Sequence, residues 1–316
     1  MTASTDPRVQ SIIETIDTCL AQAERLPGTA AHDAIFDSVP ALKARIVDTL
    51  AGDARAEAHA LGYLADMFER FKRRRPITRL PYSPVLDARY PFRDAAQNPI
   101  HIVAMTDRPD RFGACDDPRR EAVLPFVDPA CDEATLGAAY HDRLVCRAIA
   151  RADLSDPREH VLVGQLGVFA ARALRSGECL GVYGGQLLTP AMYFTCADDA
   201  FILSAVSGAD FAFVDGENIL AMANTRLAYD ADDLPVAQAG EGYNMKAVRF
   251  HVISACGRRF SIGAMFATED VEAGTELRWN YGHSAEVIAA MYRPMYLATP
   301  CFEPLPVSSR DHVTRV

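Results

Sequence analysis

The sequence lacks the cysteine spacing on which zinc knuckles and redox pairs are built. Its eight cysteines are scattered along 316 residues, and no two of them form a C-x-x-C pattern. Structural zinc sites and thioredoxin-like motifs both require closely spaced thiols. We therefore expect no metal site, and we expect reduced cysteines in a cytosol-like compartment.

Long apolar runs and a secretory leader are also missing. No stretch is long enough to span a bilayer, and residues 1–7 are polar rather than basic and then apolar. Neither a membrane association nor Sec-type secretion is therefore expected.

Net positive charge is absent as well. The net charge is -10 and the pI is about 5.3. Direct binding to nucleic acid needs a basic surface, so we do not expect it. An acidic surface attracts cationic partners such as Lys/Arg-rich protein tails, although the same charge also serves solubility. The basic cluster FKRRRP at 71–76 fits a solvated helix end as well as a targeting signal.

The first quarter of the chain has the periodicity of helices. Apolar residues recur at spacings of three and four through residues 1–75, which predicts a bundle of three amphipathic helices. The second helix is expected to break or kink near Pro40, because proline cannot donate to the preceding turn.

A proline-rich connecting region follows at residues 76–155. Nine of the nineteen prolines lie between Pro76 and Pro129, so we expect an irregular, extended chain there. Two elements are predicted within it, a strand at Ile100–Met105 and a helix from Asp132 to Ala150.

From about His160 the pattern changes to short apolar or alternating runs separated by glycine, aspartate and serine. The runs are HVLVG, GVFAA, CLGVYGG, FILSAV, FAFV, AVRFHVI and RFSIGAMFA. Such runs are typical of many short strands in a compact β unit. We expect an α+β protein with an N-terminal helical bundle, this β-rich unit over residues 156–283, and a C-terminal helix and tail over 284–316, capped by Ser284.

Four segments of the β-rich part resemble, in the same order, the SET-domain family of protein-lysine methyltransferases. They are GQLGVFAARALRSGECLGVYGGQL (164–187), NILAMANT (218–225), YNMK (243–246) and IGAMFATEDVEAGTELRWNYG (262–282). The resemblance covers roughly residues 160–282 and implies a SET-type fold, or β-clip. It also implies S-adenosylmethionine as the cofactor and a protein lysine side chain as the substrate.

The resemblance assigns roles to individual residues. It implies that Tyr281 orients the amine nucleophile and that Tyr183 lines the lysine channel. Trp279 falls where the family has the aromatic residue that limits the number of methyl groups, and it either narrows the channel or packs away. Tyr292 and Tyr296 would cover the cofactor. The residues expected to bind the cofactor are Gly164, Leu166, Gly167, Phe169, Asn224, Thr225 and Tyr281.

The chain also departs from the family pattern. The family's Arg-Phe-Ile-Asn-His is here AMANT at 221–225, so the arginine and the histidine are missing. An acidic insertion at 226–242 follows, and no cysteine-rich zinc segment comes after Tyr281. These losses leave open a catalytically degenerate SET fold that acts as a protein-binding module. A further alternative places the working surface on the N-terminal helices.

The composition is rich in Ala, Arg and Asp and poor in lysine, as in proteins of high-GC bacteria. Bacterial members of the family are often delivered into host cells, and short polar N-terminal segments occur on such exported proteins. The resemblance thus implies a bacterial effector, cytoplasmic or secreted into a host cell, whose substrates are histones or other basic proteins.

Overall fold

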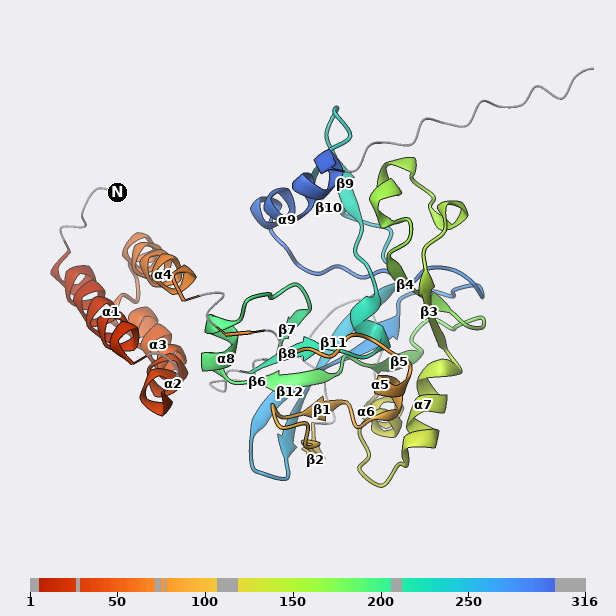
Figure 1. Ribbon diagram of the computed structural model, residues 1–316, viewed down its shortest axis with the longest axis horizontal. Coiled ribbons are helices and arrows are strands. Elements are labelled where there is room, and N and C mark those ends of the chain that lie inside the picture. Colours follow the sequence, from red (N-terminus) through yellow and green to blue (C-terminus); the bar gives the residue numbers. More distant parts are fainter. Residues whose placement is uncertain are drawn as a thin grey trace, which may run out of the picture.

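The computed structural model describes residues 6–26, 29–71, 75–76, 78–106, 119–205 and 212–298. Within these ranges the chain is α+β, with helices at the N-terminal end, many short strands in the middle and one helix at the C-terminal end (Figure 1). This architecture confirms the expected fold class. Residues 72–74 of the basic cluster and the tail after residue 298 lie outside the described residues. No described helix has both the length and the apolarity to cross a bilayer.

The N-terminal bundle contains one more helix than predicted, because the expected interruption divides the second helix. The break falls at Ser38, and Pro40 lies in the first turn of the next helix, where its missing amide hydrogen costs nothing. Side chains cap the helices at Asp6 and Thr29, which accept the amides of Arg8 and His32. The helices are α1 (Pro7–Arg25), α2 (Ala30–Asp37), α3 (Val39–Thr49) and α4 (Ala54–Glu69).

A helix from the β-rich half completes this bundle. Ala191 and Phe194 of α8 (Pro190–Thr195) belong to the same apolar cluster as Phe36 of α2. The carboxylate of Asp37 accepts the backbone amide of Ala191 at 2.9 Å. In Figure 1, α8 lies between the N-terminal helices and the strands. The bundle is therefore packed against the β-rich half rather than tethered to it.

The connecting region contains more regular structure than the prolines suggested. The strand predicted at Ile100–Met105 is confirmed as β2. The helix predicted from Asp132 to Ala150 is wrong beyond His141, because residues 144–148 pair with residues 166–170 as antiparallel strands and this pairing outweighs their helical spacing. The elements are α5 (Val85–Ala88), β1 (Phe92–Arg93), β2 (Ile102–Met105), α6 (Arg120–Val123), α7 (Glu133–His141) and β3 (Leu144–Ala148).

The predicted strands of the β-rich unit form, with one exception. HVLVG is wrong as a strand, because a 3-10 helix at Pro157–Leu162, capped by Asp156, occupies most of it. The strands are β4 (Leu166–Ala170), β5 (Cys179–Val182), β6 (Gly185–Leu188), β7 (Ile202–Ser204), β8 (Phe213–Gly216), β9 (Leu227–Tyr229), β10 (Pro235–Gln238), β11 (Met245–Ser254) and β12 (Arg259–Ala267).

These strands build several small sheets around one core. Two four-stranded sheets have the orders β1-β6-β8-β7 and β2-β11-β12-β5, and two pairs are β3-β4 and β9-β10. Phe92 and Tyr140 of the connecting region pack in the same cluster as Phe260 and Leu220. The connecting region therefore shares its hydrophobic core with the β-rich unit. The chain continues into α9 (Ala285–Ala298), where Ser284 accepts the amide of Val287 as the predicted cap.

Truncation of Phe194 should destabilise the whole protein, because its ring fills the core of the N-terminal bundle. We expect Phe194→Ala to lower the free energy of unfolding by about 3 kcal/mol. Leu297→Ala is the control, since Leu297 is 72% exposed and its loss should change stability by less than about 0.5 kcal/mol. Denaturant unfolding of both variants measures the difference, and equal midpoints would contradict the docking of α8.

Candidate active site

The segment ELRWNYG, residues 276–282, runs between β4 and residues 223–225. The amide of Leu277 donates to the carbonyl of Val168 in β4 at 2.7 Å, and the amide of Trp279 donates to the carbonyl of Asn224 at 3.2 Å. Backbone bonds on both sides therefore fix the position of this segment.

Asn244 holds the same segment from a third direction. Its Nδ2 donates to the carbonyl of Glu276 at 2.9 Å, and its Oδ1 accepts the amide of Arg278 at 2.9 Å. Val168, Asn224 and Asn244 come from the first three segments that carry the family resemblance, and residues 276–282 end the fourth. All four segments thus meet at one place, which we call the junction.

Three aromatic rings lie in a row at the junction. Trp279 lies between Tyr183 and Tyr281, with ring centres 6.2 Å and 5.0 Å away. Tyr183 and Trp279 are buried, and Tyr281 is partly exposed. The structure thus brings together the three residues predicted to be catalytic.

Both tyrosine hydroxyls donate to backbone carbonyls. Tyr281 donates to Ala223 at 2.7 Å and Tyr183 to Phe201 at 2.6 Å. Burial raises the pKa of Tyr281 well above its ordinary value, helped by the nearby Tyr292, and burial also raises the pKa of Tyr183. Both hydroxyls are therefore neutral near pH 7. Because each proton is already bound to a carbonyl, each oxygen offers a ligand only lone pairs, which suit an N–H donor.

The indole of Trp279 carries the complementary group. Its Nε1 is buried and has no hydrogen-bond acceptor among the described residues. A buried donor without a partner costs about 1–3 kcal/mol. An oxygen of a bound ligand would remove that cost, so the indole points to a ligand with an acceptor.

Beside the aromatic row, three of the residues predicted to bind the cofactor meet. Asn224 Nδ2 donates to the carbonyl of Leu166 at 3.1 Å and to Oε1 of Glu276 at 3.2 Å. A Cβ at Gly167 would lie 3.0 Å from the same oxygen, so a side chain there would crowd the carboxylate. Gly167 thus makes room for Glu276, which the sequence analysis did not single out.

The carboxylate of Glu276 belongs to a buried ion-pair network that the sequence analysis missed. Arg278 pairs with Glu276 at 2.6 Å and with Glu159 at 2.7 Å, and it donates to the carbonyl of Thr225 at 3.2 Å. Burial opposes the charge of Arg278, but the two carboxylates outweigh it and raise the pKa of the guanidinium. The only sequence signal was the pair of charged residues at alternate positions of ELRWNYG.

The remaining predicted cofactor residues lie at the edges of the junction. Gly164 adopts a φ of +86° in the turn before β4. Phe169 is buried with the guanidinium carbon of Arg147 3.5 Å from its ring centre. Thr225 accepts a hydrogen bond from Nε2 of Gln238 at 2.6 Å. Their roles in cofactor binding stay predictions.

The acidic insertion forms the β9-β10 hairpin and lies next to the junction. Oε1 of Gln238 accepts the amide of His283 at 2.6 Å, just after the predicted catalytic tyrosine. Tyr296, one of the two tyrosines expected to cover the cofactor, packs on the insertion with its hydroxyl 2.6 Å from that of Tyr229, and its role as a cover stays a prediction. The other tyrosine, Tyr292, lies near Tyr281 and contributes to the raised pKa of its hydroxyl.

Among the described residues, no three His, Cys, Asp or Glu side chains are grouped as metal ligands. Burial lowers the pKa of His283, whose ring contacts the ring of Tyr281 edge-on at 5.5 Å. His283 is therefore mostly neutral at pH 7.

Neither a protein-family model nor a curated protein matches this chain. Three solved structures of SET-domain histone lysine methyltransferases show a partial likeness. KRYPTONITE in complex with mCHG DNA and SAH is 14% identical over 38% of this chain and 21% of its own, with a TM-score of 0.27. The autoinhibited ctPRC2 bound to S-adenosylmethionine is 16% identical over 54% of this chain and 18% of its own, with a TM-score of 0.29. ATXR5 in complex with histone H3.1 is 14% identical over 75% of this chain and 91% of its own, with a TM-score of 0.34.

The chain thus spans about a fifth of the length of the KRYPTONITE and ctPRC2 chains that it matches. At these TM-scores the likenesses assign no role to a residue of this chain.

Removal of the guanidinium at the centre of the network should leave two buried carboxylates without the cation that lies between them. We expect Arg278→Gln to lower the free energy of unfolding by about 3–5 kcal/mol. Arg175→Gln is the matched control, because Arg175 pairs with Asp270 at the surface with 86% of its side chain exposed, and it should cost less than about 1 kcal/mol. Denaturant unfolding compares the two, and similar losses would show that the network is solvated.

Proposed function

We propose that this protein is a SET-type methyltransferase that uses S-adenosylmethionine to methylate a lysine side chain of a protein. The observation that carries the proposal is the pair of hydroxyls on Tyr183 and Tyr281. Both are fixed as acceptors by backbone carbonyls, and both flank Trp279 at the junction of the four family-like segments. A lysine amine has N–H groups to donate to such acceptors.

The residues of the junction also suit the cofactor. Aromatic faces attract a cation such as a sulfonium, and the partly exposed ring of Tyr281 offers such a face. The unpartnered N–H of Trp279 would find an acceptor among the cofactor's oxygens. Gly167 and Asn224 would hold the cofactor beside Glu276. When bound, S-adenosylmethionine supplies the methyl group and leaves as a neutral thioether.

The task of the protein in this displacement is alignment. Tyr281 Oη accepts an N–H of the substrate amine and directs its lone pair, and positioning of this kind accounts for much of the rate. The amine must be neutral, whereas free lysine has a pKa of about 10.4. Burial beside Tyr183 and Trp279 removes water from the amine, and the positive sulfonium would lie nearby. Both effects disfavour the ammonium form and therefore lower that pKa.

We also propose basic proteins, histones among them, as substrates. The net charge of -10 supports this, because an acidic enzyme attracts a cationic tail. The acidic hairpin β9-β10 contacts the chain next to Tyr281 through Gln238 and His283, so it is placed to meet such a tail. A bacterial origin and delivery into a host cell stay predictions from the composition.

Loss of the Tyr281 hydroxyl should remove alignment but not cofactor binding. We expect Tyr281→Phe to slow methyl transfer by about 100-fold while the dissociation constant of S-adenosylmethionine stays within about twofold. The control is Tyr243→Phe, because the Tyr243 hydroxyl also bonds to backbone carbonyls, those of Arg226 and Ala239 in the insertion, and Tyr243 is not one of the predicted site residues. Mass spectrometry of a histone mixture measures transfer, and calorimetry measures binding.

Asn224→Ala should act on binding and raise the dissociation constant of S-adenosylmethionine. A wild-type protein that shows no binding at about millimolar cofactor would refute the proposal and favour the degenerate SET fold as a protein-binding module. Binding with transfer that Tyr281→Phe leaves intact would refute the role of the hydroxyl.

The value of kcat/KM should rise with pH between about pH 7 and about pH 10 and should not fall within that range. As the pH rises from about 7 to about 10, the fraction of neutral lysine grows. Burial keeps the pKa of Tyr281 above this range, so its hydroxyl stays protonated while the amine loses its proton. We expect kcat/KM to increase across the whole range. A falling limb below about pH 10 that Tyr281→Phe abolishes would show that the tyrosine ionises.

A further inference from the structure

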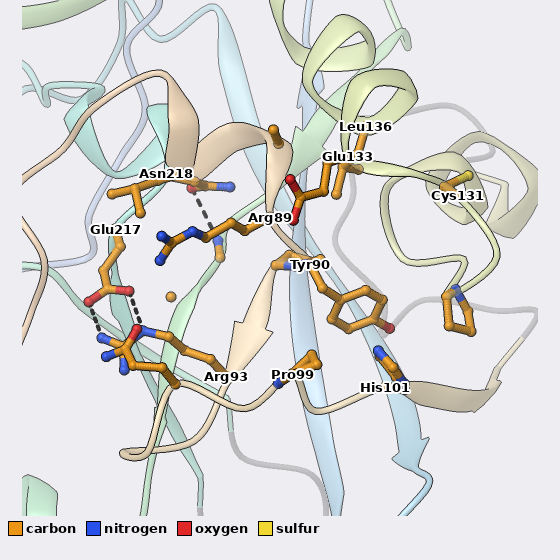
Figure 2. Close-up of a pocket in the computed structure, with 17 residues that line it drawn as sticks. Arg89, Tyr90, Arg93, Pro99, His101, Cys131, Glu133, Leu136, Glu217 and Asn218 are labelled. Carbon is orange, nitrogen blue, oxygen red and sulfur yellow. Dashed lines mark hydrogen bonds and ion pairs between the residues drawn. The ribbon is translucent and has the colours of Figure 1, made fainter.

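A cavity of about 430 Å³ lies between the connecting region and the β-rich unit. Figure 2 shows its lining, which comes from four parts of the chain, 86–101, 129–136, 184–185 and 217–218. The volume is within the range of small-molecule sites, about 300–1,000 Å³. Tyr183, Trp279 and Tyr281 are not among its lining residues. The cavity is therefore distinct from the junction.

Most polar groups of the lining are already satisfied. Arg93 and Glu217 form a buried two-bond ion pair, and Glu217 also accepts the amide of Leu80 at 2.7 Å. Asn218 donates to the carbonyl of Val182 at 2.7 Å and accepts the amide of Gly184 at 3.2 Å. These groups form a neutral wall that has no need of a ligand.

Two charged side chains of the lining remain without a partner among the described residues. Figure 2 shows the guanidinium of Arg89 reaching into the cavity between Asn218 and the Arg93–Glu217 pair, and the carboxylate of Glu133 beside the stem of Arg89. A guanidinium presents a planar set of N–H donors that matches a carboxylate, and a carboxylate offers only acceptors. Together they present one positive and one negative group to the same space.

The other end of the cavity is apolar. Tyr90 lies there with His101, their ring centres 4.8 Å apart, together with Pro99. The hydroxyl of Tyr90 is engaged by the carbonyl of Val127 and the amide of Ile102, each at 2.8 Å. Its ring face is therefore what a ligand would meet, and aromatic rings favour other apolar or aromatic groups.

We propose that this cavity binds a free α-amino acid with a large apolar side chain. Its carboxylate would bind Arg89, its ammonium would bind Glu133, and its side chain would lie against Tyr90 and His101. An α-amino acid is the simplest molecule that carries both charges and an apolar group within a few bonds. The proposal does not depend on methyltransferase activity.

The experiment pairs each charged group of the protein with one charge of the ligand. The probes are L-phenylalanine, phenylacetate, which lacks the ammonium, and phenethylamine, which lacks the carboxylate. Full-length wild type, Arg89→Gln and Glu133→Gln are titrated with each probe by calorimetry. Arg55→Gln serves as the control, since Arg55 is an exposed arginine of α4 outside the cavity.

We expect wild type and Arg55→Gln to bind L-phenylalanine more tightly than either partial probe. Arg89→Gln should weaken L-phenylalanine and phenylacetate by about tenfold and leave phenethylamine unchanged. Glu133→Gln should weaken L-phenylalanine and phenethylamine and leave phenylacetate unchanged. Both side chains are exposed, so both variants should fold, which circular dichroism verifies.

Two results would overturn the proposal. One is the absence of saturable binding of all three probes at about 10 mM. The other is a pattern in which the two variants weaken all probes equally, or neither weakens any, because the charges would then not recognise the ligand's ends.

Discussion

The site depends on the passage of residues 276–282 between β4, Asn224 and Asn244. Backbone amides of this segment donate to Val168 and Asn224, and Asn244 bonds to its peptide groups from another side. A segment held from three directions cannot shift without breaking several buried hydrogen bonds. The aromatic row inherits this rigidity, because two of its three rings belong to the segment. The row therefore depends on contacts from three separate parts of the β-rich unit and not on residues 276–282 alone.

The buried ion-pair network also helps to fix the position of residues 276–282. Glu159, Glu276 and Arg278 come from two distant parts of the chain and are nearly buried, and each carboxylate lies within 2.7 Å of the guanidinium. Any alternative packing would leave a charge unpaired in the interior, at a cost of several kcal/mol. Gly167 contributes by leaving space for a carboxylate where a side chain would collide with it. Both charge pairing and the space at Gly167 therefore disfavour other packings of residues 276–282.

Sequence patterns predicted the elements whose local periodicity agrees with their tertiary partners, such as α1 and the β11-β12 hairpin. They failed where a partner distant in sequence prevailed, as at Leu144–Ala148, whose helical spacing gave way to pairing with β4. Within the site, the resemblance of the first and fourth segments to the SET family predicted that Tyr183, Trp279 and Tyr281 lie close together. The carbonyl of Ala223 carries no side-chain signature, and Glu159 lies 119 residues before the arginine that it binds. Such contacts are visible only in three dimensions.

The sharing of one core between α8 and the N-terminal helices has a consequence for any recombination of the chain. Ala191 and Phe194 lie in the middle of the β-rich half, yet they are covered by residues from the first seventy-five. A recombination that exchanged the helical part for an unrelated module would uncover this apolar face and leave Asp37 without its amide partner. A substitution at this contact on either part would therefore alter the packing of the other. The shared core limits which helical part the β-rich half could accept.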